Sequence, residues 1–332
     1  MSASTTARNA DTVERVKALT DKLEAGVKDV FESGAYMEYL KTMSKFHRYS
    51  FRNVILIFMQ YPTASNVAGF QAWKKNFGRT VKKGEHGIQI FAPFMVNQLT
   101  LRDKLDRQTM QPVIGPDGTP EKEWAIEKRK TYRPVYVFDV SQTEGKELPT
   151  LAVNELTGNV PFYDRMFSAI EQFSPVEIVF RPMKMGKGKF SPLEQKISIN
   201  EGMSQVQTLK TAIHEAAHAK LHNYGLKAIL SGAEEVKSRQ TREVEAESVA
   251  YVVCQHFGID TSDYSFGYVT GWSRDKELDV LKSSLDCIST TAAEFIDQIE
   301  ALCPELSHDL KPAEKDGNVF HRETHFAAGK SH

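Results

Sequence analysis

A His-Glu-x-x-His pattern at residues 214–218 is the stretch whose residue types and spacing are best suited to chemistry. On a helix, residues four positions apart lie on one face, so His214 and His218 can bind one Zn²⁺ at roughly 2.0–2.1 Å each. Glu215 lies beside them, where it can act as general base for a water molecule on the metal. The pattern therefore predicts a hydrolytic zinc centre.

A third protein ligand has to come from elsewhere, because hydrolytic zinc needs three protein ligands and one open position. His222 continues the same helix face, but on an unbroken helix it lies a full turn beyond the metal. Glu243 and Glu247 are four residues apart on a second expected helix and share a face. We expect Glu243 to be the ligand and Glu247 to accept a hydrogen bond from a ligand histidine. Glu245 points to another side of that helix and is not expected to bind the metal.

This arrangement resembles the gluzincin metallopeptidases, which carry H-E-x-x-H on one helix and a ligand glutamate on the next. The match holds at His214, Glu215, His218 and Glu243, whereas at Glu247 the family more often has aspartate. The resemblance implies a zinc metallopeptidase. The alternative interpretation is a surface helix whose histidines and glutamates are only solvated.

The elements that must position these residues follow from hydrophobic periodicity and capping residues. Ser204 is expected to cap the helix that carries the histidines, which ends near Asn223-Tyr224-Gly225. Because two strands precede the metal helix, an edge strand could hold an extended peptide beside the metal by strand addition. The other elements expected in this half are a helix at 161–173, strands at 176–181 and 195–200, a Gly- and Lys-rich turn at 185–189, and a helix at 281–302.

The N-terminal half alternates amphipathic helices with short strands. The expected helices span 11–33, 36–46, 51–60 and 69–77, and the expected strands span 79–83, 87–96 and 134–140. Residues 97–131 are rich in Lys, Glu, Asp, Gly and Pro, which predicts a long solvated hairpin between two of these strands.

Residues 41–91 form a locally basic module with nine Lys or Arg and a single carboxylate, Glu85. Aromatic residues are interleaved with these charges, as in surfaces that bind single-stranded nucleic acid through phosphate contacts and base stacking. In the alternative interpretation the aromatic residues belong to the core and the lysines are ordinary solvated charges. The aromatic set is Phe46, His47, Tyr49, Phe51, Phe70, Trp73 and Phe77.

The same segment resembles the N-terminal domain of the ArdC-type antirestriction proteins, through Tyr49-Ser50-x-x-Asn53 and then Gln71-Ala72-x-x-x-x-x-Gly78-x-x-Val81-x-x-Gly84-Glu85-x-Gly87. The resemblance covers roughly 11–96, 134–143 and 160–275. It implies a single-stranded-DNA-binding domain joined to a zinc metallopeptidase domain, in a protein of plasmids and other mobile elements. With Arg79, Lys82 and Lys83 at phosphates, the expected DNA-binding residues are Lys45, Arg48, Tyr49, Arg52, Asn53, Trp73, Lys74, Arg79, Lys82 and Lys83.

Length and composition are those of an ordinary globular protein of two domains: 332 residues, 41% hydrophobic, 26% charged and a net charge of −1. Three widely spaced cysteines fit a reducing compartment, and neither a signal peptide nor an apolar run of ~20 residues is found. We therefore expect a cytoplasmic α+β protein without membrane contact. Its expected parts are a flexible stretch at 1–10, an ArdC-like α/β domain at 11–145 with the insertion at 97–131, a linker at 146–160, a zincin-like domain at 161–305 and a disordered tail at 306–332.

Three functions are compatible with these features. The first is a Zn²⁺-dependent metallopeptidase coupled to single-stranded DNA, acting on a protein substrate that the sequence does not identify. The second is a non-catalytic DNA-binding protector against restriction, with structural zinc. The third is a repressor-cleaving protease of a mobile element. For the first, Tyr264 and Tyr268 are weak candidates as donors to the oxyanion, since a core or surface role is the simpler interpretation of either tyrosine.

Overall fold

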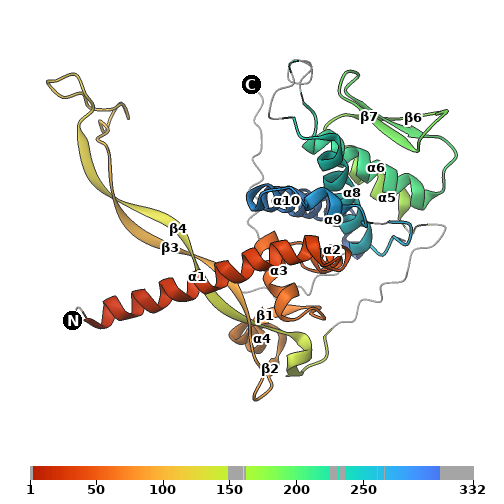
Figure 1. The fold of residues 1–332 in the computed structure, drawn as a ribbon. Coiled ribbons are helices and arrows are strands. Elements are labelled where there is room, and N and C mark those ends of the chain that lie inside the picture. Colours follow the sequence, from red (N-terminus) through yellow and green to blue (C-terminus); the bar gives the residue numbers. More distant parts are fainter. Residues whose placement is uncertain are drawn as a thin grey trace. The chain divides into compact units, whose positions relative to one another are not determined.

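Helix α8 (Arg239–His256) is the central helix of the part of the chain that positions the predicted metal ligands. Helices α6 (Gln205–Leu221), α10 (Leu278–Leu302) and α2 (Tyr36–Lys45) all pack against it (Figure 1). The computed structural model describes residues 3–148, 160, 162–224, 231, 236–259, 261–264 and 266–306. Within them the fold is mixed α+β, as predicted.

The composition of α8 explains its central place. Most of its side chains are buried, and many of them are small or β-branched, such as Ala246, Val249, Ala250 and Val253. Small side chains let neighbouring helices approach closely. A helix that is buried on several sides has no continuous polar face of the kind that a surface helix shows. The buried face of α6 likewise contains Ala212, Ala216 and Ala217.

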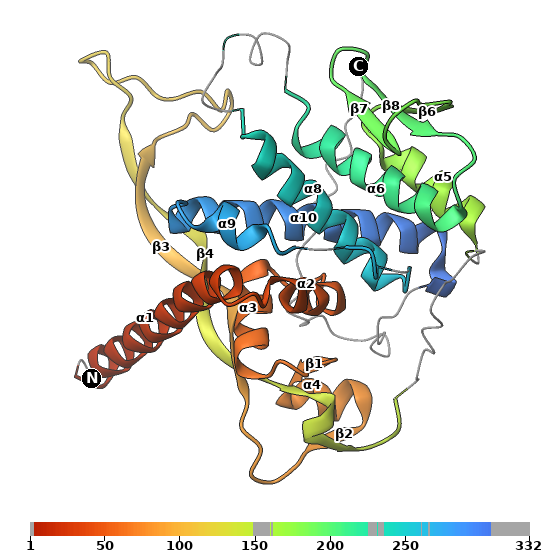
Figure 2. The ribbon, with the colours of Figure 1, turned by 45° about the vertical axis from the view of Figure 1, so that its right-hand side comes forward.

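A three-stranded sheet lies beside α6, in the order β6 (Glu177–Arg181), β8 (Lys196–Asn200), β7 (Gly188–Ser191). Strands β6 and β8 are parallel, β7 is antiparallel to β8, and helix α5 (Tyr163–Phe173) precedes the sheet (Figure 2). The helix and strands β6 and β8 were predicted. Strand β7 was not, because Gly- and Lys-rich residues indicate a turn. Its pairing with β8 overrides that local preference.

The N-terminal helices start and end close to their predicted positions, with one exception. Helix α1 (Ala3–Glu32) begins at Ala3, whereas we expected loose chain up to residue 10. Ser50 caps α3 (Phe51–Gln60) by accepting a hydrogen bond from the Asn53 backbone N–H. After strand β1 (Val67–Gly69), Gly78 ends α4 (Phe70–Phe77) in the left-handed conformation that favours glycine.

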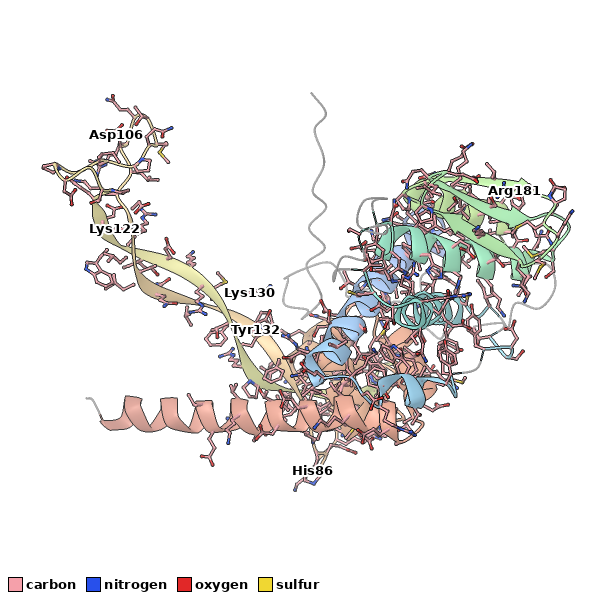
Figure 3. The ribbon with its side chains drawn as sticks, turned by 45° about the horizontal axis from the view of Figure 1, so that its top comes forward. His86, Asp106, Lys122, Lys130, Tyr132 and Arg181 are labelled. Atoms are coloured by element: carbon pink, nitrogen blue, oxygen red, sulfur yellow. The ribbon has the colours of Figure 1, made fainter. Side chains whose placement is uncertain are left out.

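Strands β3 (Ile88–Asp103) and β4 (Lys122–Asp139) form a ribbon much longer than the predicted strands. The predicted hairpin at 97–131 is confirmed. It is less polar on its surface than we expected, because Leu99, Trp124 and Ile126 are more than half exposed. Figure 3 shows side chains along the ribbon, including those of Asp106, Lys122, Lys130 and Tyr132.

The described residues form two compact units, one of residues up to 18 with 90–135 and one of 19–89 with 136 onward. Helices α2 and α3 thus share the second unit with α8 and α10. The expected domain boundaries at 145 and 161 stay a prediction, since linker residues 149–159 lie outside the described residues. The expected helix end at Gly225 and the tail at 307–332 also lie outside them.

The remaining short elements connect these parts. Strand β2 (Arg79–Val81) pairs with β5 (Thr143–Gly145), which follows the 3-10 turn η1 (Val140–Gln142). Helix α9 (Val269–Ser273) precedes α10, and η2 (Pro304–Leu306) follows it. The three cysteines, Cys254, Cys287 and Cys303, are free. No helix in the described part of the chain is long and apolar enough to cross a membrane.

Candidate metal centre and nucleic-acid surface

The three predicted ligands converge at one point between α6 and α8. His214 Nε2 and His218 Nε2 are 3.1 Å apart, and Glu243 Oε2 lies 3.8 Å from the first and 3.6 Å from the second. Three ligand atoms at ~2.0–2.2 Å from one ion in tetrahedral directions lie roughly 3.3 Å from one another. The separations therefore fit a single divalent ion.

The protonation states of these groups also suit metal binding, which requires neutral imidazole and ionised carboxylate. Burial, reinforced by neighbouring His218, lowers the pKa of His214 to about 4. The neighbouring His218 side chain is the main cause that lowers the pKa of Glu243. At neutral pH, His214 thus keeps its lone pair and Glu243 its charge.

Glu215 is held by the edge strand of the sheet. Its Oε2 accepts a hydrogen bond from the Phe190 backbone N–H at 2.7 Å. Burial raises the pKa of Glu215, a shift suited to a group that takes up and returns a proton. Gly188 lets strand β7 lie this close to helix α6. A Cβ at position 188 would lie 2.4 Å from Thr211 Cγ2 and 3.1 Å from Glu215 Cγ. The sequence showed the glycine but gave no signal that it contacts the metal helix.

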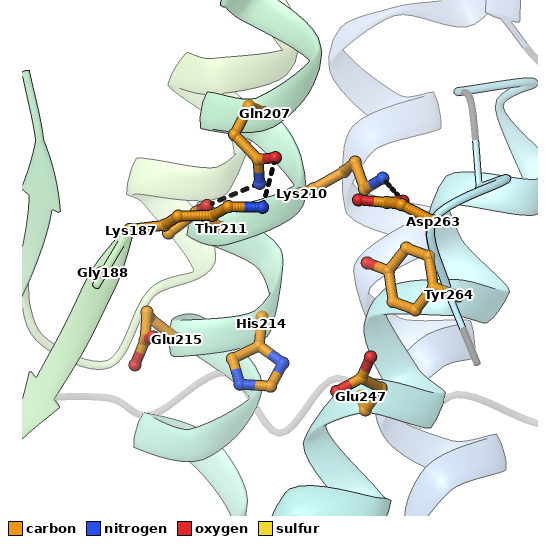
Figure 4. A pocket seen from close by; sticks show the side chains of 10 residues that line it. All are labelled: Lys187, Gly188, Gln207, Lys210, Thr211, His214, Glu215, Glu247, Asp263 and Tyr264. Atoms are coloured by element: carbon orange, nitrogen blue, oxygen red, sulfur yellow. Dashed lines mark hydrogen bonds and ion pairs between the residues drawn. The ribbon is translucent and has the colours of Figure 1, made fainter. Parts of the chain in front are cut away.

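A polar cavity of about 270 Å³ adjoins His214 and Glu215 (Figure 4). Lys210 lies one turn before His214 on α6, is 6% exposed and forms an ion pair with Asp263. Its Nζ lies 4.8 Å from the ring centre of Tyr264, which makes a cation–π contact. The sequence analysis overlooked this lysine. The other lining residues are Lys187, Gly188, Gln207, Thr211 and Glu247.

His222 contacts His218 but does not belong to the ligand triangle, the three predicted metal ligands His214, His218 and Glu243. Its Nδ1 lies 3.1 Å from His218 Nδ1, and its Nε2 lies 2.9 Å from Glu245 Oε2. The partner of His218 Nδ1 is thus His222. Glu247 as acceptor for a His214 N–H stays a prediction. As expected, Glu245 points away from the ligand triangle.

The two tyrosines considered as oxyanion donors have different surroundings. Tyr264 lines the cavity, where burial raises its pKa. Tyr268 is 40% exposed, and burial together with the charges of Glu247 and Glu243 raises its pKa. Both phenols therefore stay protonated and able to donate a hydrogen bond.

A second group of possible ligands, His47, Asp297 and Glu300, also has its atoms within 4.8 Å of one another. The guanidinium of Arg48 lies 3.2 Å from Glu300 and 3.8 Å from Asp297. A cationic side chain therefore already balances the two carboxylates. The group is better explained as an ion-pair network than as a second metal site.

Several residues expected at DNA are buried, which corrects the sequence analysis. Trp73 is 1% exposed and donates its indole N–H to the Phe138 carbonyl, and Tyr49 is 6% exposed with its hydroxyl 3.3 Å from the Val67 carbonyl. Asn53 is also buried, 6% exposed in the first turn of α3. These side chains pack the core. The two buried rings have no free face on which a base can stack.

Two partly buried arginines of the expected basic set bind protein groups instead of facing solvent freely, and the exposed Lys82 also donates its ammonium to the Ser141 carbonyl at 2.8 Å. Arg48 pairs with Asp297 and Glu300, while the Arg79 guanidinium donates to Thr143 and to the carbonyl of Lys146. The exposed members of the expected set are Lys45, Arg52, Lys74, Lys82 and Lys83. Lys75 and Phe70 add to them, the latter 48% exposed. Exposure thus separates the basic residues that can meet phosphates from those that hold the fold.

Comparisons with family models, curated proteins and solved structures each give a match. Residues 10–138 match the family model of the N-terminal domain of anti-restriction factor ArdC. An uncharacterized protein of Bacillus anthracis, pXO2-81, is 28% identical over 331 residues, which cover 89% of this chain and 53% of the relative. The chain therefore spans about half the length of this curated relative.

Two crystal structures of the antirestriction ArdC protein from the R388 plasmid have weak similarity to this chain. The metal-free structure has 21% identity and a TM-score of 0.42, and the Mn(II)-bound structure has 20% identity and a TM-score of 0.40. Each match covers 77% of this chain and 84% of the other. Residues 10–138 are thus similar to the N-terminal domain of anti-restriction factor ArdC, which confirms the ArdC-type resemblance read from the sequence.

Proposed function

We propose that this chain is an antirestriction-type protein in which a metal-dependent peptidase centre is joined to a surface for single-stranded DNA. The observation that supports the peptidase part most directly is the ligand triangle of His214, His218 and Glu243 with Glu215 beside it. The domain match to the anti-restriction factor ArdC supports the DNA part.

The position of the predicted metal ligands beside the sheet supports a zincin-like peptidase. Residues 187 and 189 pair with β8, since the Asn200 N–H donates to the Lys187 carbonyl and the strands are antiparallel. The backbone groups of Gly188 and Phe190 therefore face the other edge of β7, which lies toward α6. A substrate peptide added to this edge would run past Glu215 and the ligands.

His214, His218 and Glu243 would hold the ion, and a divalent cation there supplies Lewis-acid activation of water and of the scissile carbonyl. Nitrogen and carboxylate ligands suit Zn²⁺, which we favour, and also accept Mn²⁺. Glu215 takes a proton from the attacking water and returns it to the leaving amine. The hydrogen bond from Phe190 fixes the carboxylate that moves this proton. The protonated Tyr268 hydroxyl is the candidate donor toward the developing oxyanion.

Replacing Glu215 by Gln tests the catalytic proposal. The variant should bind Zn²⁺ or Mn²⁺ with the affinity of the parent, because Glu215 is not a ligand, and should cleave no peptide or protein. Metal content by mass spectrometry and cleavage of a proteome-derived peptide library measure the two properties. A variant that cleaves like the parent would rule out the role of Glu215. A variant that lacks cleavage but protects DNA fully would favour the non-catalytic protector.

The proposed DNA surface consists of Phe70, Lys74, Lys75, Lys82 and Lys83, on α4 and in the turn after β2. Phe70 and Lys74 are four residues apart on α4 and share a face, so a base can stack on the ring while the ammonium meets a phosphate. This set keeps the predicted Lys74, Lys82 and Lys83, adds Lys75, and replaces the buried Trp73 by an exposed ring.

Salt dependence tests this surface. The double variant K82Q/K83Q should reduce the slope of log K against log salt by roughly 1.4 for single-stranded DNA, at ~0.7 per lost phosphate contact. The control is K184Q/K189Q, which removes two exposed lysines near the C-terminal sheet and should leave the slope unchanged. Equal slopes for parent and K82Q/K83Q, measured by fluorescence anisotropy on an oligonucleotide, would contradict the proposal.

A further inference from the structure

A buried histidine–glutamate pair adjoins the ligand triangle and has no role in the function proposed so far. His222 forms the C-terminal end of α6 and is 2% exposed, and Glu245 on α8 is 0% exposed. We propose that His222 and Glu245 are positioning residues that hold His218 in the orientation and tautomer in which its Nε2 binds the metal. This inference rests on the proposed metal centre.

The hydrogen bonds form a continuous chain away from the metal ligands. His218 uses Nε2 toward His214 and Glu243, and its other ring nitrogen, Nδ1, lies 3.1 Å from His222 Nδ1. The far side of the His222 ring then meets Glu245, with Nε2 and Oε2 2.9 Å apart. Each ring therefore has a partner at both of its nitrogens.

The direction of every bond follows from the carboxylate at the end of the chain. Glu245 receives Lys237 Nζ on both oxygens, at 2.7 and 2.9 Å, and the Ser284 hydroxyl on Oε1 at 2.7 Å. An ionised carboxylate only accepts, so His222 must carry its proton on Nε2 and leave the lone pair on Nδ1. His218 must then donate its own proton from Nδ1, which leaves its Nε2 lone pair for the metal.

The packing makes this arrangement rigid. Lys237 precedes α8, Glu245 lies on α8, Ser284 lies on α10 and His222 ends α6, so four parts of one compact unit meet at this carboxylate. Groups that orient a ligand histidine typically change metal affinity by 10–100-fold when they are removed. His222 is therefore expected to matter for metal binding although it never touches the ion.

Two replacements of similar size separate positioning from simple filling of space. H222Q keeps an acceptor and a donor in the side chain, whereas H222L fills the space but can form neither bond. H222L should lower the affinity for Zn²⁺ and Co²⁺ about 10–100-fold, and H222Q should recover most of that loss. Affinities are measured by competition with a chromophoric chelator, and the visible absorption of the Co²⁺ protein reports the ligand geometry. A role in packing alone would make H222L and H222Q equal.

The chain contains a matched control in a second buried pair, His256 and Glu300. His256 Nδ1 lies 2.8 Å from the Ser44 carbonyl and its Nε2 lies 3.1 Å from Glu300 Oε1, and neither residue belongs to the ligand triangle. H256L should change metal affinity less than ~3-fold while destabilising the fold. E245Q and E300Q form the corresponding pair at the carboxylates. They remain informative if H222L does not fold.

The outcomes distinguish this inference from the function on which it rests. A parent protein that binds no divalent ion would overturn both the metal centre and the positioning role. A parent that binds, together with H222L or E245Q variants that bind equally well with the same Co²⁺ spectrum, would overturn the positioning role alone. Loss of affinity in H256L and E300Q to the same extent as in H222L and E245Q would likewise show that the effect is one of general destabilisation.

Discussion

The contact between β7 and α6 gives a sharp prediction, because one missing side chain permits it. Changing Gly188 to Ala would place a Cβ 2.4 Å from Thr211 Cγ2, where carbon atoms normally keep ~3.5–4.0 Å. Gly188 does not use a left-handed backbone conformation, so the effect of the alanine is steric. Relieving the overlap requires a shift of about 1 Å between the strand and the helix.

The expected cost has two parts. Overpacking of this kind costs ~1–3 kcal/mol. A shift of about 1 Å would also lengthen the 2.7 Å bond from the Phe190 N–H to Glu215 beyond hydrogen-bond range, at a cost of roughly 1 kcal/mol. We expect G188A to lower the free energy of unfolding by about 2–4 kcal/mol and to weaken peptide cleavage, since Glu215 loses the bond that orients it.

Urea denaturation followed by circular dichroism on the metal-free protein measures the stability. Thr211→Ser removes the Cγ2 methyl that lies in the way and keeps the hydroxyl that accepts from Gln207. G188A/T211S should therefore recover at least ~1 kcal/mol relative to additivity of the single changes. Gly267 is the control, because nothing lies within 4 Å of a Cβ placed there, and G267A should stay within about 0.5 kcal/mol of the parent. A G188A variant as stable as the parent, or a double variant without coupling, would refute this account.

Three further predictions concern the same compact unit. His214 has its pKa lowered to about 4 by burial, so between pH 6.5 and 4 the unfolded metal-free chain binds a proton that the folded chain does not, and the parent loses stability as the pH falls. H214A lacks this group, so the unfolding free energy of H214A minus that of the parent should increase by up to ~1.4 kcal/mol for each pH unit of acidification, measured in EDTA. A difference that does not change with pH would contradict the lowered pKa. The buried Tyr36 hydroxyl lies 2.8 Å from Ser248 Oγ, which itself donates to the Val244 carbonyl, so Tyr36 is the donor to Ser248. In thermal unfolding, S248A leaves the buried Tyr36 donor unpaired and should destabilise by ~1–3 kcal/mol, more than the ~0.5–1.5 kcal/mol of Y36F. The reverse order would show that Tyr36 is not the donor. R48M should lower stability and leave the DNA salt slope unchanged, because Arg48 is committed to ion pairs with two carboxylates, and a slope reduced by ~0.7 would restore it to the DNA surface.

The sequence by itself determined the parts of the site that depend on local geometry. The spacing of His214 and His218 places both on one face of any helix, and Ser204 caps that helix as its residue type indicates. The helices at 36–45 and 51–60 also follow from their apolar pattern. These features need only contacts between residues close in the chain, which is why no tertiary information was required.

Tertiary structure decided what depends on residues far apart in the chain. Glu243, Glu245 and Glu247 lie within five positions, yet only the packing of α8 between α6 and α10 directs Glu243 to the histidines and Glu245 to His222. Basic and aromatic residues of the N-terminal module look alike in sequence, and burial alone assigns Trp73 to the core and leaves Phe70 exposed. Strand β7 exists because β8 offers it backbone partners. Burial and long-range pairing are properties of the assembled fold, so neither composition nor periodicity contains them.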